Sequence, residues 1–340
     1  MKRILIIEVN WLGDVLFSTP FIKAVKGHYK DSYLAVLVVP GCVEVLTLNP
    51  HVDKVIAFDE DGAHKGIIGK IRLIAELRKE RFDIAFILHR SFTRALIALL
   101  SGIGSRVGYF TRKRALILSK PIEVPVKEMH KVEYFLNIAS SMGMDTGDKN
   151  YEFHFGGDDK FYIESFLFDK GVTADDKIVV INPGGNWNPK RWPEESFAQL
   201  IDALTDAFGA KVVITGAAKD IPLAEEISNM THKKPLISCG KTTIKRLGAL
   251  LSKAKLVISN DSGPMHLAVA VGAKVIALFG PTSPELTGPY GDGDYVVIRK
   301  AKDCDVPCYD LSCTDNKCMR LITVDDVMKE ARGMLGKTGL

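Results

Sequence analysis

Short apolar runs rich in β-branched residues alternate along the chain with segments whose apolar positions follow a helical spacing. Strands that alternate with helices are typical of parallel sheets joined by crossover helices. The pattern therefore predicts an α/β protein with doubly wound parallel sheets. The predicted strands are Arg3–Glu8, Leu34–Val39, Ile84–Leu88, Ile178–Asn182, Lys211–Thr215, Leu256–Ser259 and Val275–Phe279, and the clearest predicted helices are Lys70–Lys79, Phe197–Ala207 and Ile244–Leu251.

The chain is long enough for two domains, because 340 residues exceed what one hydrophobic core usually organises. The polar stretch Met144–Lys160, which contains Gly147, Gly156 and Gly157, is the best candidate for a linker. We therefore expect two Rossmann-like domains, residues 1–155 and 156–340, that face a cleft. The final helix is a candidate for packing back on the first domain.

The composition, 46% hydrophobic and 25% charged, is that of a soluble globular enzyme. The opening segment Met1–Ile7 resembles the start of a signal peptide, but Glu8 and Asn10 end its apolar run early. No apolar stretch approaches the roughly 20 residues that a membrane-spanning helix needs. We therefore expect a cytoplasmic protein.

Positive charge is concentrated in the first half of the chain. The net charge of +4 is too small to indicate nucleic-acid binding. Residues 1–150, however, carry 22 Lys and Arg against 16 Asp and Glu, a net charge of +6, and the remainder carries −2. The first half is expected to meet an anionic partner, although each cation alone could equally belong to a solvated surface. The basic residues that cluster are Arg90 and Arg94, and then Arg106, Arg112, Lys113 and Arg114.

Ligands of doubly wound sheets bind beyond the carboxyl ends of the strands, so functional residues are expected in the loops that follow the strands. After Leu256–Ser259, Asp261 or Ser262 can cap a helix that Pro264 opens, and Gly263 permits close approach of a ligand. Free N–H groups and the helix dipole suit a diphosphate at that point. An ordinary capped helix is the alternative.

The loop after Ile178–Asn182 combines two glycines, Gly184 and Gly185, with two cations, Lys190 and Arg191. Such a loop can approach a phosphate and neutralise it. Alternatively, Arg191 only stacks on Trp192 and one of the two cations faces solvent. Two further loops, Gly216–Asp220 and Gly280–Pro284, could line a nucleotide pocket, although each alone is ordinary turn chemistry.

In the first half, Arg3–Glu8 leads into Asn10–Asp14. Asp14 could take a proton from an incoming hydroxyl group, or it could serve as the N-cap of the following helix. The chain contains no GxGxxG after a strand, no P-loop, no GxSxG and no HExxH. Dehydrogenases, P-loop NTPases, serine hydrolases and zincins are therefore disfavoured.

Taken together, five loops resemble, in order and spacing, the motif series of the bacterial ADP-heptose:lipopolysaccharide heptosyltransferases of glycosyltransferase family 9. The resemblance covers nearly the whole chain and is nearest to the type II enzymes, which add the second heptose of the inner core. The loops are Asn10–Asp14, Pro183–Gly185 with Lys190–Pro193, Gly216–Asp220, Asn260–His266 and Gly280–Pro284.

This resemblance implies the GT-B fold and an inverting transfer of heptose from ADP-heptose, with no cofactor and no catalytic metal. The acceptor, the lipid A core oligosaccharide at the inner face of the cytoplasmic membrane, would bind the first domain and the donor the second. Asp14 matches the proposed base of relatives, and Lys190 the residue that stabilises the departing diphosphate. The donor residues implied are Gly184, Gly185, Lys190, Arg191, Asp261, Ser262, Gly263, His266 and Thr282, and the acceptor residues expected are Asn10, Trp11, Gly13, Arg106, Arg112, Lys113 and Arg114.

The chain also departs from the family pattern. Gly184 and Gly185 stand where some relatives, type I enzymes especially, have hydroxyl residues, and Pro264 stands where type II enzymes commonly have a bulkier apolar residue. A type I enzyme or another family 9 transferase is therefore the first alternative. A nucleotide-sugar 2-epimerase and a non-catalytic nucleotide-sugar-binding protein are the further alternatives.

Four of the six cysteines form a C-x3-C-x4-C-x4-C series near the C-terminus: Cys304, Cys308, Cys313 and Cys318. Their thiolates could hold a structural Zn²⁺, but the spacing lacks the usual CxxC pairs. Free thiols are therefore the first interpretation, metal binding the second, and disulfides the last for a cytosolic protein. Cys42 and Cys239 are isolated and are expected to be buried thiols.

Overall fold

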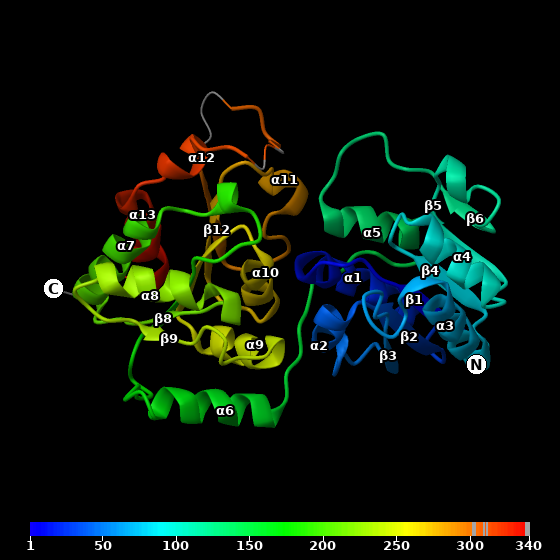
Figure 1. Ribbon diagram of the computed structural model, residues 1–340, viewed down its shortest axis with the longest axis horizontal. Coiled ribbons are helices and arrows are strands. Elements are labelled where there is room, and N and C mark those ends of the chain that lie inside the picture. Colours follow the sequence, from blue (N-terminus) through cyan, green and yellow to red (C-terminus); the bar gives the residue numbers. More distant parts are fainter. Residues whose placement is uncertain (301–303, 309, 311, 337–340) are drawn as a thin grey trace. The chain divides into compact units, whose positions relative to one another are not determined.

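The computed structural model describes residues 1–300, 304–308, 310 and 312–336. The chain divides into two compact units, Met1–His154 and Phe155–Leu340. In the part of the chain described, each unit contains one six-stranded sheet in which all paired strands are parallel, with helices joining the strands (Figure 1). The predicted α/β class with doubly wound sheets is confirmed.

In the first unit the strand order is β3-β2-β1-β4-β5-β6. Its central strands are buried on both faces, which is why they read as continuous apolar runs in the sequence. The strands are β1 (Arg3–Ile7), β2 (Tyr33–Val38), β3 (Lys54–Ala57), β4 (Ile84–Ile87), β5 (Ser105–Tyr109) and β6 (Lys120–Ile122), and the α-helices are α1 (Leu12–His28), α2 (Val43–Leu46), α3 (Gly66–Glu80), α4 (Phe92–Leu100) and α5 (Lys131–Ser140).

The second unit repeats the same topology, with strand order β12-β11-β10-β7-β8-β9. The strands are β7 (Ile178–Asn182), β8 (Lys211–Ile214), β9 (Leu236–Ile237), β10 (Leu256–Asn260), β11 (Val275–Phe279) and β12 (Tyr295–Arg299). The α-helices are α6 (Gly157–Phe168), α7 (Glu194–Phe208), α8 (Ile221–Met230), α9 (Ile244–Lys253), α10 (Gly263–Ala270), α11 (Pro284–Thr287), α12 (Lys317–Arg320) and α13 (Val324–Leu335).

In each sheet the chain starts in the middle, runs to one edge and then returns to fill the other. The order reverses between β1 and β4 in the first sheet and between β7 and β10 in the second. In doubly wound sheets the loops that leave such neighbouring strands diverge to opposite faces, and ligands bind beyond the carboxyl ends at that point. The topology therefore singles out the loops after β1, β4, β7 and β10.

The sequence pattern did not predict the edge strands β3, β6, β9 and β12, or β5, which lies next to β6. β3 has the exposure pattern of a half-covered strand, β6 contains Pro121, and β9 has two residues. Such strands bury too little apolar surface to stand out as apolar runs. None of the described helices is long and apolar enough to cross a membrane.

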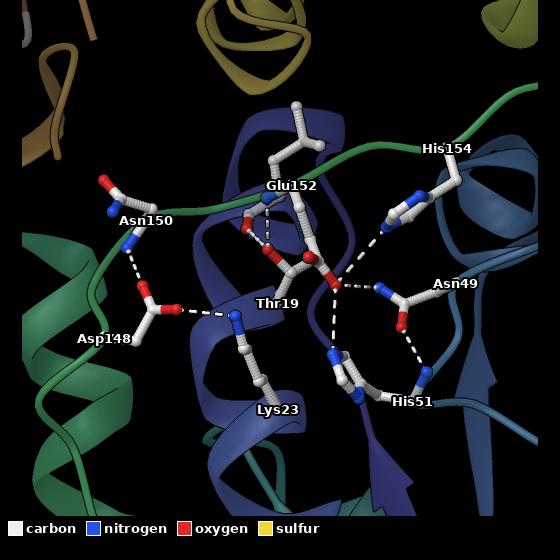
Figure 2. A network of polar contacts seen from close by, with 9 residues as sticks. Thr19, Lys23, Asn49, His51, Asp148, Asn150, Glu152 and His154 are labelled. Carbon is white, nitrogen blue, oxygen red and sulfur yellow. Dashed lines mark hydrogen bonds and ion pairs between the residues drawn. The ribbon is translucent and has the colours of Figure 1, made fainter. Parts of the chain in front are cut away.

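The segment predicted as a linker is tied to the first unit as far as His154 (Figure 2). The backbone N–H of Glu152 donates to Thr19 Oγ1 on α1 (3.0 Å). The Glu152 carboxylate accepts from Asn49 Nδ2 (3.2 Å) and faces the Nε2 atoms of His51 (3.6 Å) and His154 (3.4 Å). Beyond this anchor the chain enters α6, so the connection between the units is short.

The last helix, α13, begins with a capping box in which Thr323 and Asp326 exchange hydrogen bonds. Its buried residues Val327, Met328 and Ala331 join the core of the second unit, and the helix packs against α7, β10 and β11. Its apolar face is thus used within the second unit.

Candidate functional site

Three loops of the second unit meet at the side chain of Asp261. Lys190, from the loop after β7, lies with Nζ 2.6 Å from Asp261 Oδ2, and Thr282, from the loop after β11, donates to the same oxygen at 2.6 Å. The Asp261 carboxylate is buried, while Lys190 keeps part of its side chain exposed. The Lys190 ammonium group also lies 5.0 Å from the centroid of the Trp187 ring. A cation is therefore held at the carboxyl edge of this sheet.

Two buried asparagines that the sequence analysis did not select hold these loops together. Asn182 ends β7, and its Nδ2 donates to the hydroxyl oxygens of Ser259 (3.2 Å) and Ser262 (2.9 Å). Asn260 ends β10, donates to Pro183 O (2.8 Å) and accepts from the backbone N–H of Trp192 (3.2 Å). The sequence signal that could have identified Asn182 and Asn260 is an asparagine side chain at the end of each of two buried strands.

The start of α10 has the form that the sequence predicts. Ser262 is the N-cap residue, Gly263 is the first helical residue and Pro264 follows it. The Asp261 carboxylate accepts from Lys190 and Thr282, so Asp261 supports the loop as an ion-pair partner rather than as the N-cap. His266, on the same helix, is buried.

The remaining predicted donor residues line the same group of loops. Arg191 folds back and donates from Nε (3.1 Å) and Nη2 (2.7 Å) to Gly185 O, so it fastens the glycine loop. Trp192 is buried in the core and donates from Nε1 to Ile322 O (2.8 Å). At Gly184 an added Cβ would lie 3.1 Å from the Asp220 carboxyl group, so a side chain here would require that carboxyl group to shift by a few tenths of an ångström.

In the first unit, Trp11 occupies the N-cap position of α1, and Asp14 lies in the first turn of that helix. The alternative in which Asp14 is the N-cap is therefore wrong. Asp14 is partly exposed, as are Asn10 and Gly13, and Trp11 is 63% exposed. An indole ring and a carboxylate are thus presented together at the carboxyl edge of the first sheet.

A buried carboxyl group, Glu8, lies directly before this loop and was not selected from the sequence. Its Oε1 accepts from Ser18 Oγ on α1 (2.9 Å), and burial raises its pKa to about 8. Arg94, on α4, donates to Glu8 O, to Asn10 Oδ1 (2.5 Å) and to Glu60 Oε2 (3.1 Å). The loops after β1 and β3 are thereby joined through a buried guanidinium group.

The predicted basic surface is only partly exposed. Arg114 is fully buried, and its Nη1 donates to His89 O (3.1 Å). An added Cβ at Gly108 would lie 2.6 Å from Arg114 Nη2, so this glycine leaves room for the guanidinium group. Arg106 donates from Nε to Ile117 O (2.6 Å). The expectation of four surface cations is therefore wrong for Arg114, and Arg112 and Lys113 are the two that are exposed.

The cysteines are free thiols in the structure. Cys42 and Cys239 are buried, as expected, and burial raises the pKa of each thiol to about 12. Of the C-terminal series, Cys318 is buried and Cys304 is exposed. Within the residues that the structure describes, no group of three or more His, Cys, Asp or Glu side chains is arranged to hold a metal ion.

Comparison with known proteins identifies the family to which these loops are similar. Residues 70–318 match the model of glycosyltransferase family 9 (heptosyltransferase). The chain is 27% identical to lipopolysaccharide heptosyltransferase 2 of Escherichia coli K12 over 84% of this chain and 85% of the relative. It is 29% identical to lipopolysaccharide heptosyltransferase 3 of the same strain over 96% of each chain.

A solved structure gives the same result for the fold. The crystal structure of the family 9 glycosyltransferase from Veillonella parvula superposes with a TM-score of 0.92 at 25% identity, covering 98% of this chain and 97% of the other. The predicted GT-B fold is confirmed by this likeness.

Proposed function

Because this chain belongs to glycosyltransferase family 9, the heptosyltransferases, we propose that it transfers a heptose from ADP-heptose to the inner core of lipopolysaccharide with inversion of the anomeric centre. The observation that carries the donor half is the Lys190–Asp261–Thr282 group at the carboxyl edge of the second sheet. Relatives named as heptosyltransferases 2 and 3 support the substrate class.

In this proposal the second unit binds the donor. The N-terminus of α10 offers N–H groups to the diphosphate, and Gly263 allows its oxygens to approach the backbone. Lys190 carries a positive charge that stabilises the negative charge developing on the β-phosphate as the bond between C1 and the phosphate oxygen breaks. Asp261 and Thr282 orient that ammonium group, so their role is positioning.

The first unit supplies the base and the acceptor contacts. Asp14 takes the proton of the acceptor hydroxyl group while the hydroxyl oxygen forms its bond to C1 from the face opposite the departing ADP. Exposed Trp11 offers an apolar face to a sugar ring, and Asn10, held by Arg94, offers a polar edge. Arg112 and Lys113 would attract phosphate or carboxylate groups of the core.

The acceptor step is the finer part of the proposal. We propose the type II step, the addition of the second heptose, because the loop series is nearest to the type II enzymes. The identity to heptosyltransferase 3 is similar, so a type III acceptor is the runner-up, and a type I step follows.

The test incubates the purified protein with ADP-heptose and either a lipid A core bearing one heptose or a core bearing none. Mass spectrometry should detect one added heptose on the first acceptor only, and nuclear magnetic resonance should detect the inverted linkage. Isomerisation of the donor without acceptor would identify an epimerase, and ADP-heptose binding without turnover would identify a binding protein.

The matched variant is Asp14→Asn, which keeps the shape of the side chain and removes the base. Turnover should fall by about 10²–10⁴-fold while ADP affinity stays within about twofold of the wild type. Full activity of Asp14→Asn would reject Asp14 as the base, even if the transfer itself is observed.

A further inference from the structure

Helix α3 exposes three isoleucines on the side that faces away from the core. Ile67, Ile68 and Ile71 are 79%, 78% and 59% exposed. The opposite side of the helix buries Leu73 and Leu77 in the core of the first unit. The exposed side chains lie within one and a half helical turns, so they form a contiguous apolar surface, here called the isoleucine face. Large apolar side chains grouped on a surface in this way mark an interaction site.

The turn that carries the isoleucine face is held firmly in place. Gly69 packs against the preceding turn so closely that an added Cβ would lie 2.3 Å from the carbonyl carbon of His64. That turn is closed by Asp59, whose carboxylate accepts from the backbone N–H groups of Gly62 (3.0 Å) and Ala63 (2.9 Å). The isoleucines are therefore held outward by a defined backbone rather than by a frayed helix end.

Two exposed cations, Lys65 and Arg72, flank the isoleucine face in the sequence, and others follow at the far end of the helix. The exposed acidic residues nearest to it are Asp61 and Glu76. Glu80 pairs with Arg3 (2.5 Å) and Lys54 (2.6 Å), and Glu76 lies 3.9 Å from His64 Nε2. The exposed basic residues on and next to the helix are Lys65, Arg72, Arg78, Lys79 and Arg81. An apolar strip flanked by Lys and Arg is the signature of a helix that lies in the interface of a membrane with anionic lipids.

The isoleucine face belongs to the functional edge of the first sheet. Helix α3 starts at the carboxyl edge, because it follows β3, and the connection between them contains Glu60. Glu60 accepts from Arg94, and Arg94 donates to Asn10 in the loop that leads to Asp14. Figure 1 shows α3 and α4 covering one face of this sheet. A partner that binds the isoleucine face would therefore lie at the same edge of the first sheet as the Asn10–Asp14 loop.

We propose that the isoleucine face of α3 docks this protein on a lipid bilayer that contains anionic lipids. A second copy of the chain is the weaker occupant, because a symmetric dimer through this face would bring the cations of one helix against those of the other. An anionic lipid surface accepts the isoleucines and pairs with the cations at once.

The experiment measures flotation of the full-length protein with vesicles of phosphatidylcholine alone or with about 30% phosphatidylglycerol. The wild type should float with the anionic vesicles and remain unbound with the neutral ones, and added salt should weaken binding. The variant Ile67→Gln/Ile68→Gln/Ile71→Gln should lower the partition coefficient at least about tenfold. Gln is a good helix former and these side chains lie outside the core, so circular dichroism and Tm should be unchanged.

The control variant Phe161→Gln/Phe168→Gln removes two exposed aromatic side chains from α6 and should bind as the wild type does. The proposal is overturned if the wild type ignores anionic vesicles, if it binds neutral ones equally well, or if the two variants behave alike. A dimer in light scattering that the isoleucine variant lacks, without vesicle binding, would assign the face to a second copy. Lipid binding is read without turnover, so this result is independent of the proposed transfer.

Discussion

The buried carboxyl group of Glu8 makes a stability prediction that can be worked out from the structure. Glu8 is fully buried at the end of β1, and desolvation raises its pKa from 4.5 to about 8, although the Ser18 hydroxyl donates to it. Between these two pH values the native state keeps a proton that the unfolded chain releases. Stability is therefore fully present below about pH 4.5 and is lost as the pH rises toward 8.

The slope follows from proton linkage. One proton bound by the native state and released on unfolding lowers the free energy of unfolding by roughly 1–2 kcal/mol per pH unit, or on the order of 5 kcal/mol over the whole interval. Glu8→Gln keeps an oxygen for the Ser18 hydroxyl group and cannot ionise. The wild type should thus lose stability relative to Glu8→Gln as the pH rises from 5 to 8.

Hydrogen exchange of peptides that contain β1 reports the stability of the first unit. It is measured by mass spectrometry at pH 5, 6, 7 and 8 and corrected for the intrinsic exchange rate at each pH. The control Glu123→Gln removes an exposed carboxylate from the same unit and should differ from the wild type by a nearly constant amount. A Glu8→Gln difference that is as flat as that of the control would refute the reasoning.

Three further predictions concern the proposed transfer. Lys190→Ala should lower kcat by about 10²–10³-fold and also weaken donor binding, because the cation acts on a departing diphosphate. The control Lys211→Ala, on the exposed end of β8, should have no effect. Unchanged kinetics in Lys190→Ala would shift the role to Arg191. Transfer should persist in EDTA, since no Asp-x-Asp pair lies in a candidate donor loop, and an absolute requirement for added Mg²⁺ or Mn²⁺ would contradict the mechanism. Arg112→Glu/Lys113→Glu should raise the acceptor KM several-fold and leave the donor KM unchanged, and its acceptor KM should depend less on salt than that of the wild type. In the control Lys2→Glu/Lys30→Glu, the same change in kinetics would show a general charge effect.

Much of the architecture was readable from the sequence. Strands such as Ile178–Asn182 and Val275–Phe279 are buried on both faces, so their residues form continuous apolar runs that differ from the helices between them. Because parallel strands end at one edge, the loops that carry Lys190, Asp261 and Thr282 could be placed at that edge from the sequence, whereas the donor role of Asp261 and Thr282 came from the family resemblance. Local chemistry also predicted the start of α10 at Gly263 and Pro264.

The contacts among those loops were decided by the tertiary structure. Lys190 and Asp261 are neighbours because β7 and β10 are adjacent in the sheet, and strand order is a long-range property that local patterns do not contain. Burial is equally non-local. Arg112 and Arg114 stand two residues apart in one basic cluster, yet one is exposed and the other is covered by the packing around Gly108 and His89. Glu8 likewise has its pKa raised because of the helices that cover the end of β1, so the sequence determined which groups are present and the packing determined their charge and reach.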